Sequence, residues 1–336
     1  MRWLLTNLAL VLLLSMGAVG AAYWWLQRPM AMPAKGVELS IEPGTTAREV
    51  ALAWIQAGLD VPPLALRAWF RFSGQARHIK AGSYALAPGA TPRELLAKLV
   101  AGDEELESLR LIEGWRFSQW RAEMAKAPGL QASSAAMSDA ELMAALGRPG
   151  LAPEGRFFPD TYRYGLGVTD LTVMRRAADA MDRRLAAAWQ ARAADLPISS
   201  PEQALVLASI VEKETGRAAD RGQIAGVFIN RLRINMPLQT DPTVIYGLGE
   251  AFDGNLRKRD LQTDGPFNTY LRRGLPPTPI AMPGAASLQA AVRPADTRAL
   301  YFVARGDGSS VFSDDLAAHN RAVNQFQRRP AQSKPR

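Results

Sequence analysis

Two carboxylate side chains lie two residues apart in the segment 208–215, Ala-Ser-Ile-Val-Glu-Lys-Glu-Thr. If this segment is helical, Glu214 falls on the same face as Leu207 and Val211, because successive residues are turned by about 100°. A carboxyl group on an apolar face loses hydration, so its pKa rises and it can hold a proton near neutral pH. A general acid that protonates a glycosidic oxygen needs this property. The spacing makes Glu214 a candidate catalytic acid.

Glu212, the other glutamate, falls on a different face of such a helix, beside Leu205 and Ala208. A structural role for one of the two glutamates is the alternative, since Arg217 or Arg231 could hold it in an ion pair. On the residues of this segment alone, the structural and the catalytic interpretations are equally supported.

Polar and aromatic side chains follow the two glutamates. We expect 238–247, Leu-Gln-Thr-Asp-Pro-Thr-Val-Ile-Tyr-Gly, to be a loop; Asn-Thr-Tyr at 268–270 and Gly-Leu-Pro-Pro at 274–277 come later. Amides and hydroxyls bind the hydroxyls of a sugar, and aromatic rings stack on its apolar faces. Taken singly, each segment is more typical of a surface loop. Together they predict a substrate groove that contains Gln239, Thr240, Asp241, Tyr246, Asn268 and Tyr270.

The composition excludes several other kinds of site. The chain of 336 residues contains no cysteine, which excludes disulfides, iron–sulfur clusters and thiol nucleophiles. The two histidines, His78 and His319, are far apart in sequence, so a metal site with several histidine ligands is not expected. A serine hydrolase that uses His319 is the second enzyme class, but no Gly-x-Ser-x-Gly segment accompanies it.

The net charge of +8 favours an acidic partner, such as anionic lipid headgroups or an acidic polymer. The basic residues form short scattered clusters that are not interleaved with aromatic residues, and no nucleic-acid-binding motif accompanies them. Nucleic acid is therefore not expected as a partner.

The N-terminal region contains an uncharged, mostly apolar run from Leu8 to Leu26. As a helix this run would be about 28 Å long, close to the roughly 30 Å hydrocarbon core of a membrane. Tyr23, Trp24 and Trp25 stand at its end, where an aromatic belt is expected.

A cleaved signal peptide is the alternative, because Gly17 to Ala21 offers small residues for cleavage. The apolar run continues past this point into the tryptophans, which favours an uncleaved single-pass transmembrane anchor at residues 1–27. Residues 28–36 contain two prolines and are expected to be a short stiff linker.

A short internal repeat follows the linker, since Pro43 to Val50 recurs as Pro88 to Leu95. In each copy a threonine followed three residues later by a glutamate predicts a capping box at the start of a helix. An alternating strand is predicted before each copy, and a further helix between them. The predicted elements are the strands 37–41 and 82–86, the helix 63–72, and the capping boxes Thr46/Glu49 and Thr91/Glu94.

Two strands around two helices resemble the LysM module, which binds glycans that contain N-acetylglucosamine. We expect a small LysM-like βααβ domain at 37–104, with a purely structural α+β domain as the alternative. The following region, 105–327, is predicted to be a helix-rich catalytic domain with a C-terminal β-hairpin around Asp307-Gly308. Residues 328–336 are expected to be a disordered tail. The fold class is therefore α+β.

Ordered blocks along nearly the whole chain closely resemble the YceG-like endolytic murein transglycosylases (MltG family). The blocks are 208–215, Val-Phe-Ile-Asn-Arg-Leu at 227–232 and 238–247, with Glu-Gly-Arg-Phe-Phe-Pro-Asp-Thr-Tyr at 154–162, 268–270, 274–277 and His-Asn at 319–320. The resemblance implies an inner-membrane protein whose catalytic part is periplasmic. It also implies cleavage within nascent peptidoglycan strands, which limits their elongation, and wall-synthesis enzymes as further partners.

The resemblance places the catalytic glutamate on Glu214, the residue that the helical face also selects. The implied enzyme is a lyase, a lytic transglycosylase that cuts between N-acetylmuramic acid and N-acetylglucosamine and leaves a 1,6-anhydro end. This reaction needs no metal and no organic cofactor. The alternative is a non-catalytic, membrane-tethered glycan-binding scaffold. The roles of Glu154, Asp241 and His319 stay open at this point.

Overall fold

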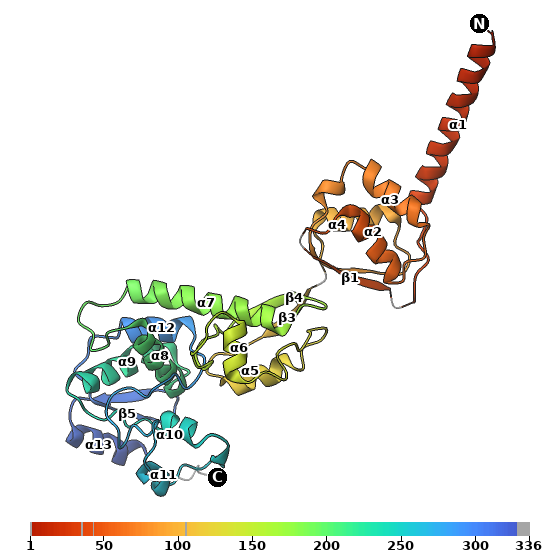
Figure 1. Ribbon diagram of the computed structural model, residues 1–336. Helices are drawn as coiled ribbons and strands as arrows, with labels where there is room; N and C mark the ends of the chain where they lie inside the picture. The colour runs from red at the N-terminus through yellow and green to blue at the C-terminus, as the bar shows by residue number, and fades with distance from the viewer. Residues whose placement is uncertain (1, 35, 43, 105, 328–336) are drawn as a thin grey trace, which may run out of the picture. The chain divides into compact units, whose positions relative to one another are not determined.

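The structure of this chain is a computed structural model that describes residues 2–34, 36–42, 44–104 and 106–327. The chain divides into two compact units (Figure 1). Unit 1 consists of Met1–Ser108, Ala127–Gln131 and Arg163–Thr169, and unit 2 contains the rest. The domain boundaries read from the sequence stay predictions, and the predicted tail at 328–336 lies outside the described residues.

Unit 1 is built on the internal repeat. The strands β1 (Val37–Ile41) and β2 (Gly82–Leu86) pair antiparallel, with Val37 opposite Leu86. Both predicted capping boxes are present, at Thr46/Glu49 and Thr91/Glu94, which confirms the two helix starts. The helices are α2 (Ala47–Gln56), α3 (Pro63–Phe72) and α4 (Pro92–Ala101), with a short 3-10 turn at Ala76–His78.

The core of unit 1 collects one apolar face from each of these helices. Trp54 of α2, Leu66 and Phe70 of α3, and Leu95 and Leu99 of α4 are at most 1% exposed. The spacing of four residues within α3 and within α4 places each pair on one side of its helix, as expected for amphipathic helices. Burial of these side chains against β1 and β2 holds the small unit together without any disulfide.

The N-terminal apolar run forms α1 (Arg2–Leu26), one continuous helix in unit 1. Several of its side chains, including those of Leu8, Ala9 and Val11, lie outside the described residues. Within the described part of the chain, no helix combines the length and the apolar character that crossing a membrane requires. The described side chains of Leu12, Leu13 and Met16 are exposed.

Unit 2 is helix-rich, and its C-terminal hairpin is confirmed. Strands β5 (Tyr301–Ala304) and β6 (Ser310–Ser313) pair antiparallel, with Phe302 opposite Phe312. A further two-stranded sheet, β3 (Leu106–Arg110) with β4 (Thr161–Gly165), had not been predicted, and the residues of both strands are divided between unit 1 and unit 2. The helices are α5 (Phe117–Met124), α6 (Asp139–Ala145), α7 (Asp170–Gln190), α8 (Pro201–Glu214), α9 (Ala218–Arg233), α10 (Asp241–Leu248), α11 (Lys258–Gln262), α12 (Ala285–Val292) and α13 (Leu316–Phe326), with a 3-10 turn at Gly249–Ala251.

The prediction of a loop over 238–247 is wrong for most of that segment. Residues 238–240 are irregular, but α10 begins at Asp241 and ends at Leu248. Pro242 lies in the first turn, where a proline is favourable because the first N–H groups of a helix have no intrahelical partner. The aspartate and proline that indicated a loop therefore mark a helix start instead.

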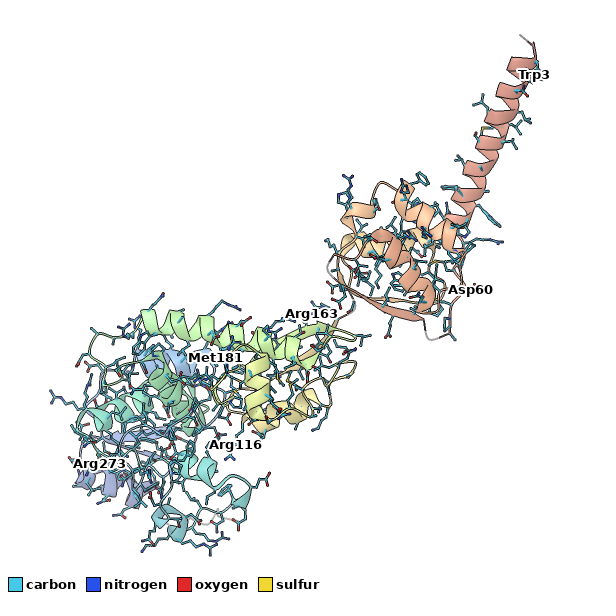
Figure 2. The ribbon with its side chains drawn as sticks, in the orientation of Figure 1. Trp3, Asp60, Arg116, Arg163, Met181 and Arg273 are labelled. Carbon is cyan, nitrogen blue, oxygen red and sulfur yellow. The ribbon has the colours of Figure 1, made fainter. Side chains whose placement is uncertain are left out.

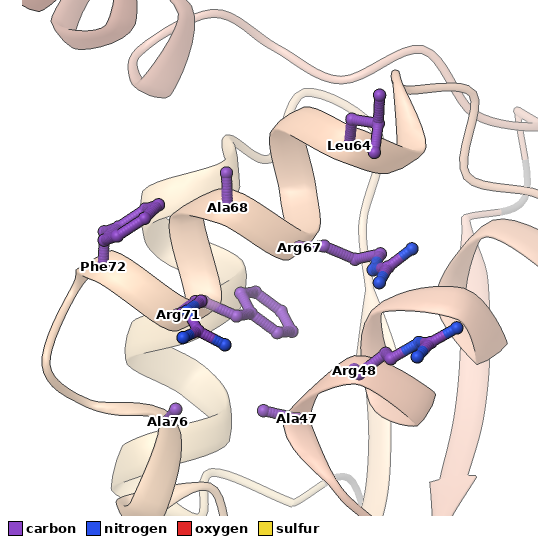
Figure 3. Close-up of a pocket in the computed structure, with 9 residues that line it drawn as sticks. Ala47, Arg48, Leu64, Arg67, Ala68, Arg71, Phe72 and Ala76 are labelled. Carbon is purple, nitrogen blue, oxygen red and sulfur yellow. The ribbon is translucent and has the colours of Figure 1, made fainter.

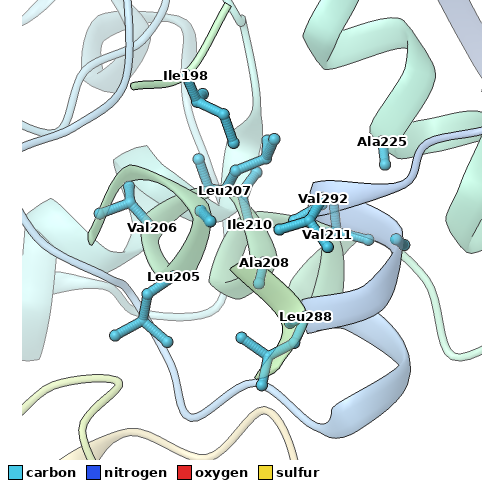
Figure 4. Packing of buried hydrophobic residues seen from close by; sticks show 14 of the residues in the cluster. Ile198, Leu205, Val206, Leu207, Ala208, Ile210, Val211, Ala225, Leu288 and Val292 are labelled. Atoms are coloured by element: carbon cyan, nitrogen blue, oxygen red, sulfur yellow. The ribbon is translucent and has the colours of Figure 1, made fainter. Parts of the chain in front are cut away.

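Helix α8 is the centre of unit 2. The eight consecutive residues Ala204 to Val211 are all buried, so this helix is enclosed on every side. It packs against α12 and α9. In Figure 4, Ile210 and Val211 of α8 lie beside Val292 of α12. A helix held in this way presents its C-terminal end at a fixed place.

Candidate active site

Glu214 is the last residue of α8. The start of the helix is fixed by Ser200, whose hydroxyl accepts the N–H of Gln203 at 3.2 Å. At the other end Thr215 is extended, so the helix stops directly after the glutamate. The unpaired carbonyls at a helix C-terminus disfavour a nearby negative charge. The position of Glu214 in the helix therefore already disfavours ionisation.

The carboxyl group of Glu214 is half-buried and accepts a hydrogen bond from the Oγ1 of Thr240. Burial raises the pKa of Glu214 to about 7, and the charge of Asp241 also raises it, against the opposing effects of Thr240 and Arg231. Within the described residues, Glu214 makes no ion pair. Near neutral pH this carboxyl group can therefore both donate and accept a proton.

Glu212 is placed differently, although it lies on the same helix. Its side chain is 6% exposed, and Arg221 approaches its Oε1 at 3.5 Å. The N–H of Gly284 donates to its Oε2 at 2.9 Å. The ion-pair partner is Arg221 of α9, and not Arg217 or Arg231 as the sequence had suggested for one of the glutamates. The structural interpretation therefore applies to Glu212.

A third carboxyl group, that of Glu113, lies beside this ion pair. Partial burial raises the pKa of Glu113, and the charge of Glu212 raises it further, whereas Arg221 lowers it. A side-chain carbon on Gly284 would lie only 1.9 Å from a carboxylate oxygen of Glu113. The bare backbone of Gly284 therefore approaches both glutamates closely.

Thr240, whose hydroxyl faces Glu214, is held through its backbone by two other buried threonines. Thr240 and Thr269 are each 2% exposed, and Thr243 is fully buried. The N–H of Thr240 donates to the Oγ1 of Thr269 at 3.1 Å, and the Oγ1 of Thr243 donates to the carbonyl of Thr240 at 2.8 Å. The hydroxyls of Thr243 and Thr269 are 2.9 Å apart. This network fixes Thr240 within a low-dielectric interior.

Gln239 precedes Thr240 in a left-handed backbone conformation, with φ 49°. Such a conformation is uncommon for a residue other than glycine and costs about 1–3 kcal/mol where it is held in place. It is held here because the N–H of Gln239 donates to the carbonyl of Thr269 at 3.0 Å. The side chain of Gln239 is exposed and remains accessible to a ligand.

Asp241 and Tyr270 form a second polar contact next to Glu214. The hydroxyl of Tyr270 donates to the Oδ1 of Asp241 at 2.5 Å. Burial raises the pKa of Tyr270, and the charges of Asp241 and Glu214 add to this effect. The predicted residues Glu214, Thr240, Asp241 and Tyr270 are therefore brought together around one carboxyl group.

Asn268 is buried, and its side-chain amide donates to backbone carbonyls of the preceding segment. The acceptors are Leu261 at 3.0 Å and Thr263 at 2.7 Å. Its Oδ1 accepts the N–H of Tyr270 at 3.0 Å. With its donors and acceptor engaged, Asn268 is better suited to hold this segment than to make the predicted contact with substrate.

Tyr246 lies at the other end of α10, in a separate pocket of about 600 Å³. Its ring packs edge-on against Phe267, and Arg116, labelled in Figure 2, lies over it at 5.1 Å. Glu154 lines the same pocket and is 6% exposed. Burial raises the pKa of Glu154 to about 7, against the opposing hydrogen bonds from Phe117 and Tyr246. Helix α10 therefore carries Asp241 near Glu214 and Tyr246 near Glu154.

Arg231 of α9 holds the backbone next to the site, a role that was not predicted from the sequence. It is 7% exposed, and its guanidinium donates to the carbonyls of Leu238 at 2.6 Å and Leu300 at 2.7 Å. The bond to Leu238 fixes the chain just before Gln239 and Thr240. The charged residue close after the apolar run 224–229 of α9 is the sequence signal that could have indicated this role.

His319 stacks on Tyr301, with ring centroids 5.1 Å apart. The guanidinium carbon of Arg231 lies 5.4 Å from the centroid of the same Tyr301 ring. Burial lowers the pKa of His319, and the positive charge of Arg231 lowers it further. This placement favours a structural role. Among the residues that the structure describes, no cluster of histidine, aspartate and glutamate is arranged to hold a metal ion.

Comparison with known proteins yields several relatives. The endolytic murein transglycosylase of Bacillus subtilis is 40% identical over 173 residues, which cover 52% of this chain and 48% of the relative. The endolytic murein transglycosylase of Streptococcus pneumoniae is 26% identical over 323 residues, which cover 86% of this chain and 58% of the relative. The chain thus spans about half the length of these curated relatives.

The fold also matches a solved structure. The crystal structure of a yceG-like protein from Listeria monocytogenes superposes with a TM-score of 0.54 at 27% identity, and covers 86% of this chain and 99% of that one. Residues 39–325 match the model of the YceG-like family. Because this match takes in both the β1–β2 repeat and the Glu214 site, the chain belongs to the YceG-like family.

Proposed function

We propose that this chain is an endolytic lytic transglycosylase of peptidoglycan, with Glu214 as its catalytic acid and base. The observation that carries the proposal is a half-buried carboxyl group with a pKa of about 7 and no ion-pair partner among the described residues. Two relatives are named endolytic murein transglycosylase, which supports the same substrate class.

The proposed reaction uses one carboxyl group twice. Protonated Glu214 donates its proton to the oxygen between N-acetylmuramic acid and N-acetylglucosamine, and the glycosidic bond breaks. The resulting carboxylate, held by Thr240, then accepts the proton of the muramic C6 hydroxyl. The C6 oxygen bonds to the anomeric carbon and closes a 1,6-anhydro ring, so the carboxyl group regains its proton and no water is consumed.

The exposed side chains around Glu214 form the proposed groove. Gln239 and Asp241 are exposed, and Tyr270 is half-buried beside Asp241. Amide, carboxylate and phenol groups suit the hydroxyl and acetamido groups of an amino sugar. Tyr246 is the proposed contact of a more distant part of the strand, because it lies near the opposite end of α10.

We further propose that α1 anchors the chain in the inner membrane, that the catalytic part lies in the periplasm, and that wall-synthesis enzymes are its partners. The exposed apolar side chains of α1 and the aromatic residues at its end support anchoring. The order β1, α2, α3, β2 supports a LysM-like module in unit 1. A reporter fused after Arg336 should be active only outside the cytoplasm; activity in the cytoplasm would contradict this location.

Digestion of purified sacculi in ¹⁸O-labelled water tests the reaction itself. Transglycosylation gives released fragments with unlabelled 1,6-anhydro ends, because the nucleophile comes from the sugar. Hydrolysis with Asp241 or Glu154 as a second carboxylate gives labelled reducing ends. A scaffold without catalytic activity co-sediments with sacculi and releases nothing.

A further inference from the structure

Unit 1 contains a pocket lined by three arginines, which the proposed reaction does not use. Arg67 and Arg71 extend from α3, and Arg48 from the first turn of α2 (Figure 3). We call it the arginine pocket; its volume is about 530 Å³. No acidic side chain lines it among the residues that the structure describes; the remaining lining residues are Ala47, Leu64, Ala68, Phe70, Phe72 and Ala76.

The positive charge of the arginine pocket is not neutralised within the described part of the chain, where none of its arginines makes an ion pair. Arg48 acts electrostatically on Glu49, but that carboxylate already accepts hydrogen bonds from Thr46. Arg48 also lies in the first turn of α2, where the helix dipole disfavours a cation. An anion bound in the pocket would relieve both the mutual repulsion and this unfavourable placement.

Large apolar side chains flank the arginines on the same helix. Leu64 is 77% exposed and Phe72 is 81% exposed. Figure 3 shows them at the two ends of α3, with Arg67 and Arg71 between them. Arginines combined with exposed leucine and phenylalanine are typical of a helix that lies in a membrane interface. A site that binds only a free sugar or a free phosphate does not require the exposed apolar side chains of Leu64 and Phe72.

The surface next to the arginine pocket joins α3 to the end of α1. The described residues that line a groove of about 320 Å³ all belong to these two helices, and Phe72 belongs to both the groove and the arginine pocket. The other lining residues of the groove are Ala22, Trp25, Leu26, Ala65, Ala68 and Trp69. Because α1 is the proposed anchor, α3 lies beside the point where the chain would leave the membrane.

We propose that the arginine pocket and the adjoining face of α3 form a docking surface for anionic phospholipid headgroups. The guanidinium groups bind the lipid phosphates, while Leu64 and Phe72 enter the boundary between headgroups and acyl chains. This inference rests on the proposed anchoring by α1. Docking gives unit 1 a second attachment to the membrane besides the anchor.

The absence of cysteine allows a single spin label to test the docking surface in the full-length protein. A nitroxide on Leu64→Cys is followed in vesicles of phosphatidylcholine with and without phosphatidylglycerol, by its collisions with a water-soluble nickel complex. We expect phosphatidylglycerol to shield this label. A label on Gln56→Cys, exposed at the other end of α2, should stay accessible.

Removal of the charges supplies the matched comparison. Combining Arg48→Gln, Arg67→Gln and Arg71→Gln should lower the equilibrium constant for docking, measured by the shielding of the label, by about 100-fold. Each arginine near an anionic surface contributes about 1 kcal/mol to the free energy of docking. Arg183→Gln, Arg293→Gln and Arg298→Gln remove the same charge from exposed positions of unit 2 and should leave docking unchanged. Equal effects of the two triple variants would contradict a specific site.

Other results identify other occupants. Equal shielding in pure phosphatidylcholine overturns the proposal, since no anionic headgroup is then needed. If inorganic phosphate without vesicles shields the label from the nickel complex, the pocket is a site for free phosphate. If soluble peptidoglycan fragments shield it, the pocket is a site for a glycan. Either result overturns lipid docking. Retention of the wild-type protein on pure phosphatidylcholine vesicles in high salt is measured in parallel, so that failure of the proposed anchoring by α1 is distinguished from failure of docking.

Discussion

Glu212 and Glu214 lie two residues apart on one helix, yet their surroundings differ in the feature that matters for proton transfer. Glu212 has an arginine partner and a backbone N–H, which together stabilise a fixed negative charge. Glu214 has a threonine hydroxyl, while the guanidinium of nearby Arg231 is directed at backbone carbonyls. Both side chains are shielded from water to some degree. The missing countercharge, and not burial alone, distinguishes the candidate acid from the structural carboxylate.

Replacement of Glu214 should have the largest effect. Glu214→Gln keeps the shape but cannot donate and recover a proton, so kcat should fall by about 10²–10⁴-fold. Because burial raises its pKa, ionised Glu214 destabilises the fold as pH rises from the ordinary carboxyl range through about 7. The variant should therefore unfold at a temperature no lower than wild type at neutral pH. Cleavage at a near wild-type rate would remove Glu214 from this role.

The pH dependence of cleavage should follow the protonated fraction of Glu214. With a pKa of about 7, this carboxyl group is increasingly ionised above neutral pH and can no longer start the reaction. We expect kcat/KM to fall by about tenfold per pH unit on the alkaline side. Glu154 has a similar pKa, so the profile is repeated with Glu154→Gln. If the alkaline limb disappears in that variant, the limb belongs to Glu154.

Thr240→Val tests the hydroxyl that distinguishes the surroundings of Glu214. The substitution removes a hydrogen bond to a group that becomes charged, which contributes about 1.5–3 kcal/mol, so cleavage should fall by at least about tenfold. The hydroxyl also lowers the pKa of Glu214, and its loss should move the alkaline limb to higher pH. A reduced rate with an unshifted limb would indicate a packing defect instead.

Glu212→Gln should have the smallest effect on cleavage and a clear effect on stability. The amide can still accept the N–H of Gly284, but Arg221 loses its carboxylate partner. Removal of one partner from a buried ion pair costs about 3 kcal/mol, measured as the free energy of unfolding in urea. Near wild-type kcat is expected for the folded fraction. A greater loss of kcat than in Glu214→Gln would reverse the assignment of the two glutamates.

Local sequence signals predicted the local elements well. The capping boxes of α2 and α4, the strands β1 and β2, and the β5–β6 hairpin depend on neighbours in sequence, and all are present. Pairing of β3 with β4 joins strands far apart in the chain and had no local signal. The Asp241-Pro242 pair is compatible with both a turn and a helix start, and in the structure it begins helix α10.

The site was predictable in part for the same reason. The helical face of Glu214 is a local property, whereas the ion pair that excludes Glu212 comes from Arg221 on the next helix. A helix buried on all sides gives no information about which glutamate is free of a countercharge. The support from Thr269 and the buried amide of Asn268 likewise depends on a loop that folds back on Thr240.

Unit 1 is not contiguous in sequence, and this has a consequence for dissection of the protein. Its main part ends at Ser108, but Ala127–Gln131 and Arg163–Thr169 also belong to it. The hydroxyl of Ser83 donates to the carbonyl of Leu166 at 3.3 Å, and Gly165 lies so close to Ser83 that a Cβ would collide with its side chain. A truncation after residue 108 therefore separates the segments 127–131 and 163–169 from the rest of unit 1. Limited proteolysis should accordingly release no stable fragment that ends there, and an exchange of unit 1 between relatives has to carry all three segments.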